Sequence, residues 1–314
     1  MKAAIIRKFG SPDVFEITDV LIPKPNKNQL LVRVFASGIN PIDWKQRKGN
    51  HRFILGSPFP IILGYDVCAE VVEIGLNISK FKTGDIVFGV LNNKYGGALA
   101  EYALGTEECF ALAPRNIRFD QAAAFPMVSI TVLQALRDKA NLKEGQTILI
   151  NGASGGVGHI AIQMAKIFRA KVIAVSSNRN QSFVESFEPN QFIDYTKTDL
   201  LKLKDKVDVF FDVAGTYSFL KCKHLLNDGG VYINTLPRLK ILVHKLFQIF
   251  SRGKKVKTLL MKHSNSDLEQ ISSWISQGKL RVEIDETFNL NNISAAHDYA
   301  QKGHNKGKNV VIIN

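Results

Sequence analysis

The sequence predicts an α/β protein with two domains, one built on a parallel sheet and one rich in short β-strands. Its 314 residues, 45% of them apolar, are enough for two hydrophobic cores. The first 125 residues contain β-rich stretches separated by turns, whereas apolar strands alternate with helices further along the chain. A glycine-rich turn joins the first of these later strands to a helix. We expect residues 1–125 and 263–314 to form one domain and residues 126–262 the other.

The expected β-rich domain begins with short strands. Residues 29–36 alternate partly between apolar and polar side chains, as a half-buried strand does. Residues 68–75 and 84–90 are further β-rich stretches bounded by glycine, and five prolines between positions 23 and 60 interrupt the segment. The pattern predicts a β-barrel-like lobe with few helices.

The chain is expected to return to this lobe at its end. Residues 268–277 carry an amphipathic helical pattern, and a second short helix is expected over residues 293–302. Residues 309–313 form a final apolar run that predicts a strand added to the first lobe.

The middle of the chain predicts a doubly wound parallel sheet. Near-continuous apolar strands are expected at residues 147–151, 171–176, 207–213 and 230–234, and residues 121–140 form an Ala/Leu-rich helical stretch. Apolar strands separated by helices are typical of a parallel sheet covered on both faces. The helix after the first strand carries apolar side chains at helical spacing, namely Val157, Ile160, Ala161, Met164 and Phe168.

The glycine-rich turn is the strongest local signal of function. Gly152, Gly155 and Gly158 have a G-x-x-G-x-x-G spacing, a variant of the dinucleotide fingerprint. Glycine allows a tight turn, a close approach of backbone to pyrophosphate and close packing of helix on strand, and the helix N-terminus adds free N–H groups. Since a strand, a helix and a second strand surround the turn, we predict nucleotide binding rather than a turn without a ligand.

Charge and cysteine content narrow the class of protein. The formal net charge is +13, and residues 236–262 contribute eight basic residues and no acidic one, so the remainder is only mildly basic and nucleic-acid binding is not expected. Within this stretch, residues 239–250 can form a helix with one apolar face, and residues 251–257 a basic tail. Such a segment can lie on an anionic membrane or be a packing helix with a solvated face, and we favour the packing helix. Three cysteines without metal or disulfide spacing, and no export signal, predict a reducing, cytoplasmic setting.

Several motifs in order resemble one family over nearly the whole chain. They are Gly38-Ile-Asn-Pro-Ile-Asp-Trp-Lys, Gly64-Tyr-Asp-Val, Gly96-Gly-Ala-Leu-Ala-Glu-Tyr, the turn that begins at Asn151, and the closing Gly303-His-Asn-Lys-Gly-Lys. This set resembles the quinone oxidoreductase branch of the medium-chain dehydrogenase/reductase superfamily. The resemblance implies a GroES-like catalytic lobe, a Rossmann lobe and a homodimer.

The resemblance is to the zinc-free members. In zinc-dependent relatives a Cys and a His occupy the positions that hold Asn40 and Tyr65 here, and neither residue is a good zinc ligand. The lobe of four close cysteines found in those relatives is also missing. We therefore expect no metal.

The resemblance places four polar residues near the substrate. Asn40 or Tyr65 could donate a hydrogen bond to a substrate carbonyl, and Asp43 and Lys45 are weaker candidates for the catalytic site. Each has a purely structural alternative. Asn40 can fix the turn before Pro41, Tyr65 can be a buried aromatic residue, and Asp43 and Lys45 can be an exposed pair.

A longer set of residues is expected to bind the cofactor. The residues of the glycine turn come first, and the loop after the second strand adds three more. The resemblance adds a threonine near the nicotinamide, which can instead be an ordinary helix-interior residue, residues near the adenosine, and a lysine that can face the phosphates or only be solvated. These are Gly152, Ala153, Ser154, Gly155, Gly156, Val157, Gly158, Thr131, Ser176, Asn178, Arg179, Tyr195, Ala214, Gly215 and Lys308.

The loop after the second strand of the parallel sheet predicts NADPH. NAD-preferring folds usually carry an acidic residue about 20 residues beyond the glycine turn, where it binds the ribose 2′-hydroxyl. This chain has Ser176-Ser-Asn-Arg179 there, and arginine suits a 2′-phosphate. We therefore expect an NADPH-dependent oxidoreductase that transfers a hydride to a quinone or an α,β-unsaturated carbonyl. The alternative is an NADPH-binding sensor or membrane-associated adaptor with little catalysis.

Overall fold

The computed structural model describes residues 1–235, 253–303 and 305–313. The chain divides into a first unit, Met1–Ile130 with His263–Asn314, and a second unit, Thr131–Lys262. The sequence placed the first boundary five residues earlier. The difference arises because helix α4, Pro126–Gln134, runs across the division.

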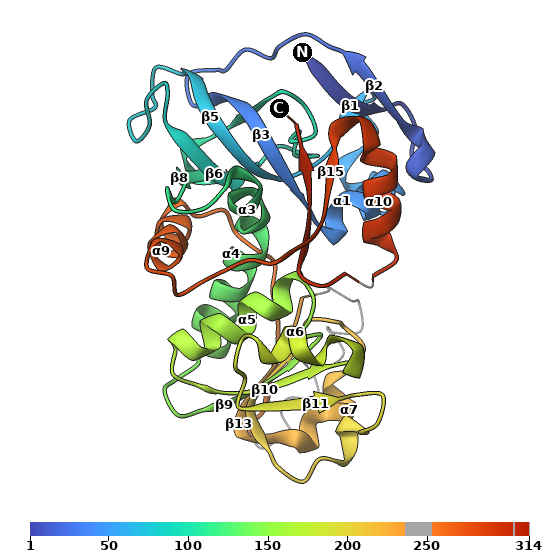
Figure 1. Ribbon diagram of the computed structural model, residues 1–314, viewed down its shortest axis with the longest axis vertical. Coiled ribbons are helices and arrows are strands. Elements are labelled where there is room, and N and C mark those ends of the chain that lie inside the picture. Colours follow the sequence, from blue (N-terminus) through green and yellow to red (C-terminus); the bar gives the residue numbers. More distant parts are fainter. Residues whose placement is uncertain (236–252, 304, 314) are drawn as a thin grey trace. The chain divides into compact units, whose positions relative to one another are not determined.

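The first unit is built on β-sheets (Figure 1). Its main sheet has the order β15-β16-β3-β5-β6-β8, with β7 also paired to β3, and a smaller sheet has the order β2-β1-β4. The C-terminal strand β16 pairs antiparallel with β3, which confirms that the chain end returns to the first lobe. The strands are β1 Lys2–Ile6, β2 Phe15–Asp19, β3 Leu30–Ile39, β4 Ile61–Ile62, β5 Asp66–Ile74, β6 Ile86–Val90, β7 Tyr102–Gly105, β8 Phe110–Leu112, β15 Ile284–Asn289 and β16 Lys308–Ile312.

Short helices close the sheets of the first unit. Helix α3 packs on β3 and β5, and α10 packs on α1. The sequence predicted a helical stretch over residues 121–140, and the structure divides it at Pro126, because proline has no N–H to continue a helical ladder. The helices are α1 Pro41–Arg47, α2 Arg52–Leu55, α3 Phe119–Ala124, α9 Asn265–Ser276 and α10 Ile293–Gln301, with 3₁₀ turns at Pro12–Val14, Glu107–Cys109 and Leu290–Asn292.

The second unit is a parallel sheet with the order β11-β10-β9-β12-β13-β14, the Rossmann arrangement. The strand order changes direction between β9 and β12. Helix α5 contacts β9 and β10 on one side of that point, and α7 contacts β13 on the other. The elements are β9 Thr147–Asn151, β10 Lys171–Ser176, β11 Gln191–Asp194, β12 Val207–Asp212, β13 Leu226–Asn234, β14 Lys255–Thr258, α5 Gly156–Ile167, α6 Gln181–Glu185, α7 Phe219–Cys222, a π-helix at Ala135–Ala140 and 3₁₀ turns at Asn178–Asn180, Leu200–Lys202 and Lys223–Leu225.

The basic stretch 236–262 is described only in part. The helix expected within residues 239–250 lies outside the described residues. Residues 255–257, expected to belong to a basic tail, form the sixth strand β14, in which Val256 is buried between exposed lysines. In the described ranges, no helix combines the length and the apolar character that a membrane crossing requires.

Candidate functional site

The three spaced glycines of the second unit differ in how much room the structure leaves for a side chain. Gly152 has a φ of +88°, and a Cβ there would lie 3.1 Å from the backbone nitrogen of Ala214. A Cβ on Gly158 would lie 2.1 Å from the carbonyl oxygen of Gly152, so only glycine allows α5 to pack against the turn. Gly155 differs, since its Cβ would meet nothing closer than 3.6 Å. Neighbouring backbone therefore closes the turn at Gly152 and Gly158, whereas the turn is open at Gly155, where a ligand could approach the backbone.

The open side lies at the N-terminus of α5. Gly155 is the N-cap, and no side chain caps the helix there. The N–H groups of the first helical turn have no partner within the helix, and together with the helix dipole they favour an anion. The N–H of Gly155 itself donates to the carbonyl oxygen of Gly152, which holds the turn in shape. An open backbone approach next to free N–H groups fits the pyrophosphate of a dinucleotide.

Three buried side chains join the turn to the end of β10. The Ser176 hydroxyl donates to the Ser154 hydroxyl oxygen at 2.9 Å, and the Asn180 amide donates to the same oxygen at 2.9 Å. All three residues are at most 9% exposed. Ser154 and Ser176 were predicted to bind the cofactor, and the structure places their hydroxyl groups in an internal network that fixes the turn against β10.

The loop beyond this network carries the exposed part of the expected adenosine site. Asn178 and Arg179 are exposed in a 3₁₀ turn, and Tyr195, which is 53% exposed, donates its backbone N–H to the carbonyl of Ser176. Asp194, which was not predicted from the sequence, also lies beside this loop. Asp194 ends β11, and its Oδ1 accepts the backbone N–H of Asn178 at 3.1 Å.

Asp212, also missed from the sequence, organises the ends of β9, β12 and β13. Its Oδ1 accepts the Asn151 amide at 2.8 Å and the backbone N–H of Gly215 at 2.9 Å. Its Oδ2 accepts the backbone N–H of Tyr217 and the Tyr232 hydroxyl. This buried carboxylate holds the turn at residues 214–215 against Gly152, so the predicted residues Ala214 and Gly215 do belong to the same edge of the sheet as the glycine turn.

In the first unit, three polar side chains from distant segments form a buried cluster. Asn40 follows β3, Asp66 begins β5 and Lys308 begins β16, and none is more than 3% exposed. The Asn40 amide donates to Asp66 Oδ2 at 2.8 Å, while its Oδ1 accepts Lys308 Nζ at 2.6 Å. Lys308 Nζ also lies 3.3 Å from Asp66 Oδ2 and donates to the carbonyl of Ile39. Burial raises the pKa of Asp66, and the ammonium of Lys308 opposes that rise.

This cluster bears on two predicted residues. Lys308 was expected to face the cofactor phosphates, but its ammonium has three partners within the first unit. Asn40 was expected to donate to substrate, and both ends of its amide are engaged by Asp66 and Lys308. The arrangement gives Asn40 one fixed orientation.

Asp43 caps helix α1. Its Oδ2 accepts the backbone N–H of Asn40 at 2.7 Å, and its other oxygen is buried without a partner. Burial raises the pKa of Asp43 to about 7, against the effect of the Asn40 hydrogen bond. The group therefore takes up or releases a proton close to neutral pH.

Tyr65 and Lys45 have different surroundings. The Tyr65 hydroxyl accepts the Gln46 amide at 2.7 Å and donates to the carbonyl of Lys94 at 2.8 Å. Burial raises the pKa of Tyr65 to about 12, so the hydroxyl stays protonated at neutral pH. Lys45 is half-buried, with its ammonium 5.3 Å from the centre of the Trp44 ring. Thr131 of α4 is also half-buried.

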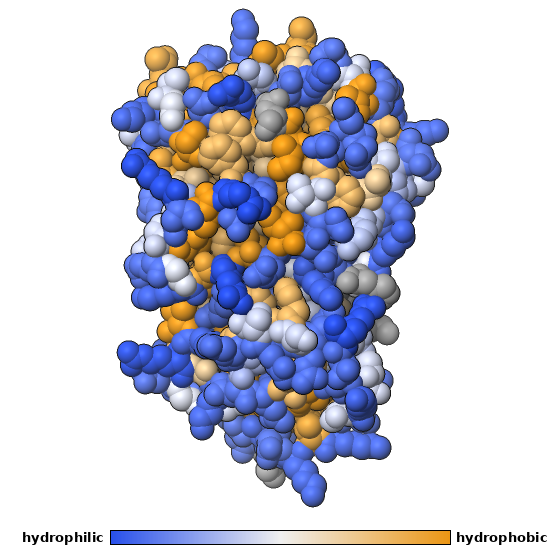
Figure 2. Space-filling view, in the orientation of Figure 1, coloured by the Kyte–Doolittle hydropathy of each residue, from blue (hydrophilic) through white to orange (hydrophobic). Residues whose placement is uncertain are grey.

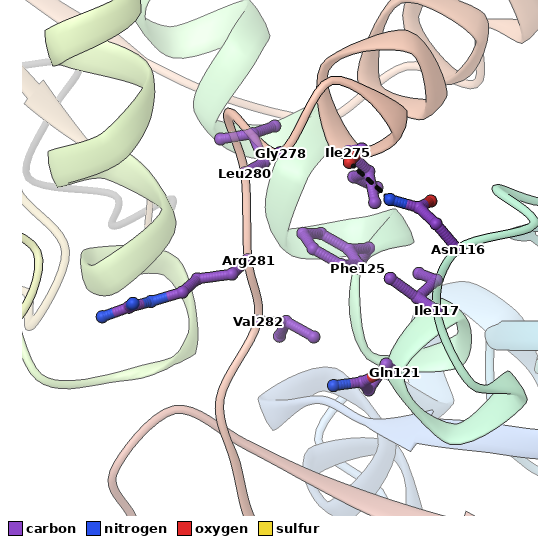
Figure 3. Close-up of a pocket in the computed structure, with 9 residues that line it drawn as sticks. All are labelled: Asn116, Ile117, Gln121, Phe125, Ile275, Gly278, Leu280, Arg281 and Val282. Carbon is purple, nitrogen blue, oxygen red and sulfur yellow. Dashed lines mark hydrogen bonds between the residues drawn. The ribbon is translucent and has the colours of Figure 1, made fainter.

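The first unit also contains an apolar hollow of about 200 Å³ that the sequence did not indicate (Figure 3). Ile117, Phe125, Leu280 and Val282 contribute to its lining. The Asn116 amide donates a hydrogen bond to the carbonyl of Ile275, which Figure 3 marks with a dashed line. The hollow offers apolar contact but no cluster of acids and bases. Within the described ranges, no three His, Cys, Asp or Glu side chains come together as metal ligands would.

Comparison with known proteins shows the family. The family models that match are an alcohol dehydrogenase GroES-like domain over residues 26–115 and a zinc-binding dehydrogenase domain over residues 188–311. A chloroplast envelope quinone oxidoreductase homolog of Arabidopsis thaliana is 34% identical over 312 residues, which cover 96% of this chain and 95% of that protein. An NADPH-dependent alkenal/one oxidoreductase of the same plant is 31% identical, covering 99% of this chain and 79% of its own length. The structure of a quinone oxidoreductase from Coxiella burnetii is 31% identical, with a TM-score of 0.92 and coverage of 100% of this chain and 99% of that one.

Proposed function

The chain belongs to the medium-chain dehydrogenase/reductase superfamily, and from this premise we propose that it is a zinc-free reductase that uses NADPH to reduce a quinone or an α,β-unsaturated carbonyl compound. Its relatives support an NAD(P)H-dependent oxidoreductase. The choice of NADPH, of substrate class and of metal-free chemistry is our proposal.

The glycine turn is the observation that carries the proposal. It is open only at Gly155, beside the free N–H groups at the start of α5, and closed where Gly152 and Gly158 pack. A dinucleotide requires these three features of its binding turn. NADPH would supply the hydride, and the residues of the chain would bind and orient both reactants.

The buried cluster of Asn40, Asp66 and Lys308 supports metal-free chemistry. In zinc-dependent relatives the position of Asn40 holds a cysteine ligand. Here the amide of Asn40 lies between a carboxylate and an ammonium, and Lys308 partly balances the charge of Asp66. We propose that this cluster positions the segment that begins α1, and that the protonated Tyr65 hydroxyl, which accepts the Gln46 amide of the same helix, adds a polar group there.

NADPH preference is proposed from the loop at the end of β10. Arg179 is exposed there, and its planar guanidinium suits a phosphate monoester. Asp194 lies against the same loop, which opposes an anionic ligand, but its Oδ1 already accepts hydrogen bonds from Asn178 and Thr196. We propose that Arg179 dominates recognition of the 2′-phosphate.

One assay tests the proposal. Oxidation of NADPH and of NADH is followed with a panel of quinones and of 2-alkenals or enones, before and after treatment with a strong chelator. We expect turnover with NADPH that survives chelation. Stoichiometric zinc whose removal abolishes activity would refute the metal-free proposal. Tight NADPH binding without turnover on any member of the panel would favour the sensor or adaptor.

A further inference from the structure

Helix α2 of the first unit exposes two neighbouring apolar side chains. Phe53 is 89% exposed and Ile54 is 82% exposed. A single exposed apolar residue is ordinary, but two adjacent large side chains with almost their whole surface in water suggest a contact that the isolated chain lacks. They project from a helix of four residues rather than line a hollow.

The fold holds this helix in place. The N–H of Gly56 donates to the carbonyl of Arg52, and the Tyr95 hydroxyl donates to the carbonyl of Gly56. Leu55, the next residue after the exposed pair, packs against the core cluster that contains Tyr95. Phe53 and Ile54 are therefore presented by an anchored element.

Basic residues lie close to the exposed pair in the sequence, and one of them, Arg52, contacts Phe53. From Trp44 to Tyr65 the chain has no acidic residue, and the flanking Asp43 and Asp66 are buried. The ammonium of Lys48 lies 5.2 Å from the centre of the Trp44 ring, and the guanidinium carbon of Arg52 lies 4.8 Å from that of Phe53. Aromatic and aliphatic side chains beside lysine and arginine are the composition of a segment that rests in a lipid headgroup layer.

We propose that the α2 tip, defined as Lys48, Arg52, Phe53 and Ile54, docks on the surface of an anionic lipid bilayer. The two apolar side chains enter the boundary between headgroups and acyl chains, while Lys48 and Arg52 face lipid phosphates. A bilayer suits side chains that protrude, whereas a peptide or protein partner would need a complementary groove for them. Docking would bring the enzyme to lipophilic quinones; this purpose rests on the proposed function, but the binding itself does not.

The test is flotation of the full chain with phosphatidylcholine vesicles that contain or lack phosphatidylserine. We expect binding that depends on phosphatidylserine. The double variant Phe53→Ser/Ile54→Ser should lower the partition coefficient roughly tenfold. The double variant Lys48→Ser/Arg52→Ser should lower it roughly 30-fold, because each cation near an anionic surface contributes about 1 kcal/mol.

Matched controls separate the α2 tip from the general basic charge of the protein. Leu76→Ser removes a leucine that is 96% exposed elsewhere in the first unit, and Lys202→Ser/Lys204→Ser removes two exposed cations of the second unit. Both should bind vesicles as the wild type does. Absence of binding by the wild type, α2 variants that bind normally, or controls that lose as much binding as the α2 variants would overturn the proposal.

Turnover of a water-soluble quinone by the wild type without vesicles is measured in parallel. Normal turnover without vesicle binding would count against docking alone. Vesicle binding without turnover would count against the proposed function alone.

Discussion

Replacement of Lys308 by methionine tests the buried cluster of the first unit. Methionine keeps the apolar stem of the side chain but removes the ammonium, which lies 3.3 Å from Asp66 and 2.6 Å from the oxygen of Asn40. Removing one partner of a buried ion pair costs about 3–5 kcal/mol, because the other charge stays buried without compensation. The Asn40 and Ile39 oxygens also lose a donor. We expect the free energy of unfolding to fall by about 4 kcal/mol near pH 8.

The loss should depend on pH in a definite direction. Burial already raises the pKa of Asp66 in the wild type, and Lys308 opposes that rise, so the variant raises the pKa further. A carboxyl group whose folded pKa is raised binds more protons in the folded state than in the unfolded state. Stability then decreases as the pH rises above the unfolded value of about 4. The difference between variant and wild type should be small at pH 4 and largest in alkaline solution.

Denaturant unfolding at several pH values measures this loss, and a second substitution gives the control. In Lys308→Met/Asp66→Asn no charge remains to be compensated, and the asparagine can still accept the backbone N–H of Met127. The double variant should recover most of the stability. A loss that is the same at pH 4 and pH 8, or a double variant no better than the single one, would refute the electrostatic reasoning. NADPH affinity of the single variant tests the separate prediction that Lys308 contacts the cofactor phosphates.

Three further predictions concern the carboxylate of α1 and the cofactor turn. Because the pKa of Asp43 is raised to about 7, the contribution of this group to the free energy of unfolding is lost as the pH rises from about 4 to about 7. Asp43→Asn should therefore flatten the dependence of that free energy on pH in this range, and parallel curves for variant and wild type would contradict the prediction. Gly155→Ala should fold normally and weaken NADPH binding, whereas Gly158→Ala should unfold at lower denaturant concentration, and calorimetry beside denaturation distinguishes the two. Arg179→Ala should weaken NADPH binding by about 10- to 100-fold and NADH binding far less, as one lost charge-assisted hydrogen bond implies; an equal effect on both would exclude a phosphate role.

The parallel sheet was predictable because its signals are local. Apolar strands at residues 147–151 and 171–176 and the glycine turn between them lie within about thirty residues, and each can be read without knowing the rest of the fold. Strand β14 was missed for a local reason too. It has only four residues, and the lysines on both sides of Val256 suggested a solvated tail, although the alternation of exposed and buried positions was present.

The buried carboxylates were not predicted, because their role depends on contacts between distant segments. Asp66 meets Lys308 across 242 residues, and Asp212 meets Asn151 across 61. Asp66 lies in the motif Gly64-Tyr-Asp-Val, which indicated the family, and Asp212 lies in the expected strand at residues 207–213. The available signal was a lone Asp at one terminus of an apolar strand, the first residue of β5 for Asp66 and the last of β12 for Asp212. The signal was insufficient, because burial of a carboxylate requires partners that only the tertiary fold supplies.

Asp194 is a carboxylate of this kind beside the expected adenosine site. From the sequence, the loop at residues 176–179 has no acidic residue, which favoured NADPH. The structure adds the carboxylate of Asp194 from the neighbouring strand. Desolvation acts to raise the pKa of Asp194, but hydrogen bonds from Thr196 and Asn178 hold it below its usual range. These donors engage Oδ1, so the carboxylate shapes the loop and its charge is partly compensated. A preference for the 2′-phosphate therefore has to come from Arg179 itself and not from an absence of acidic residues, and the Arg179→Ala comparison between the two cofactors tests this directly.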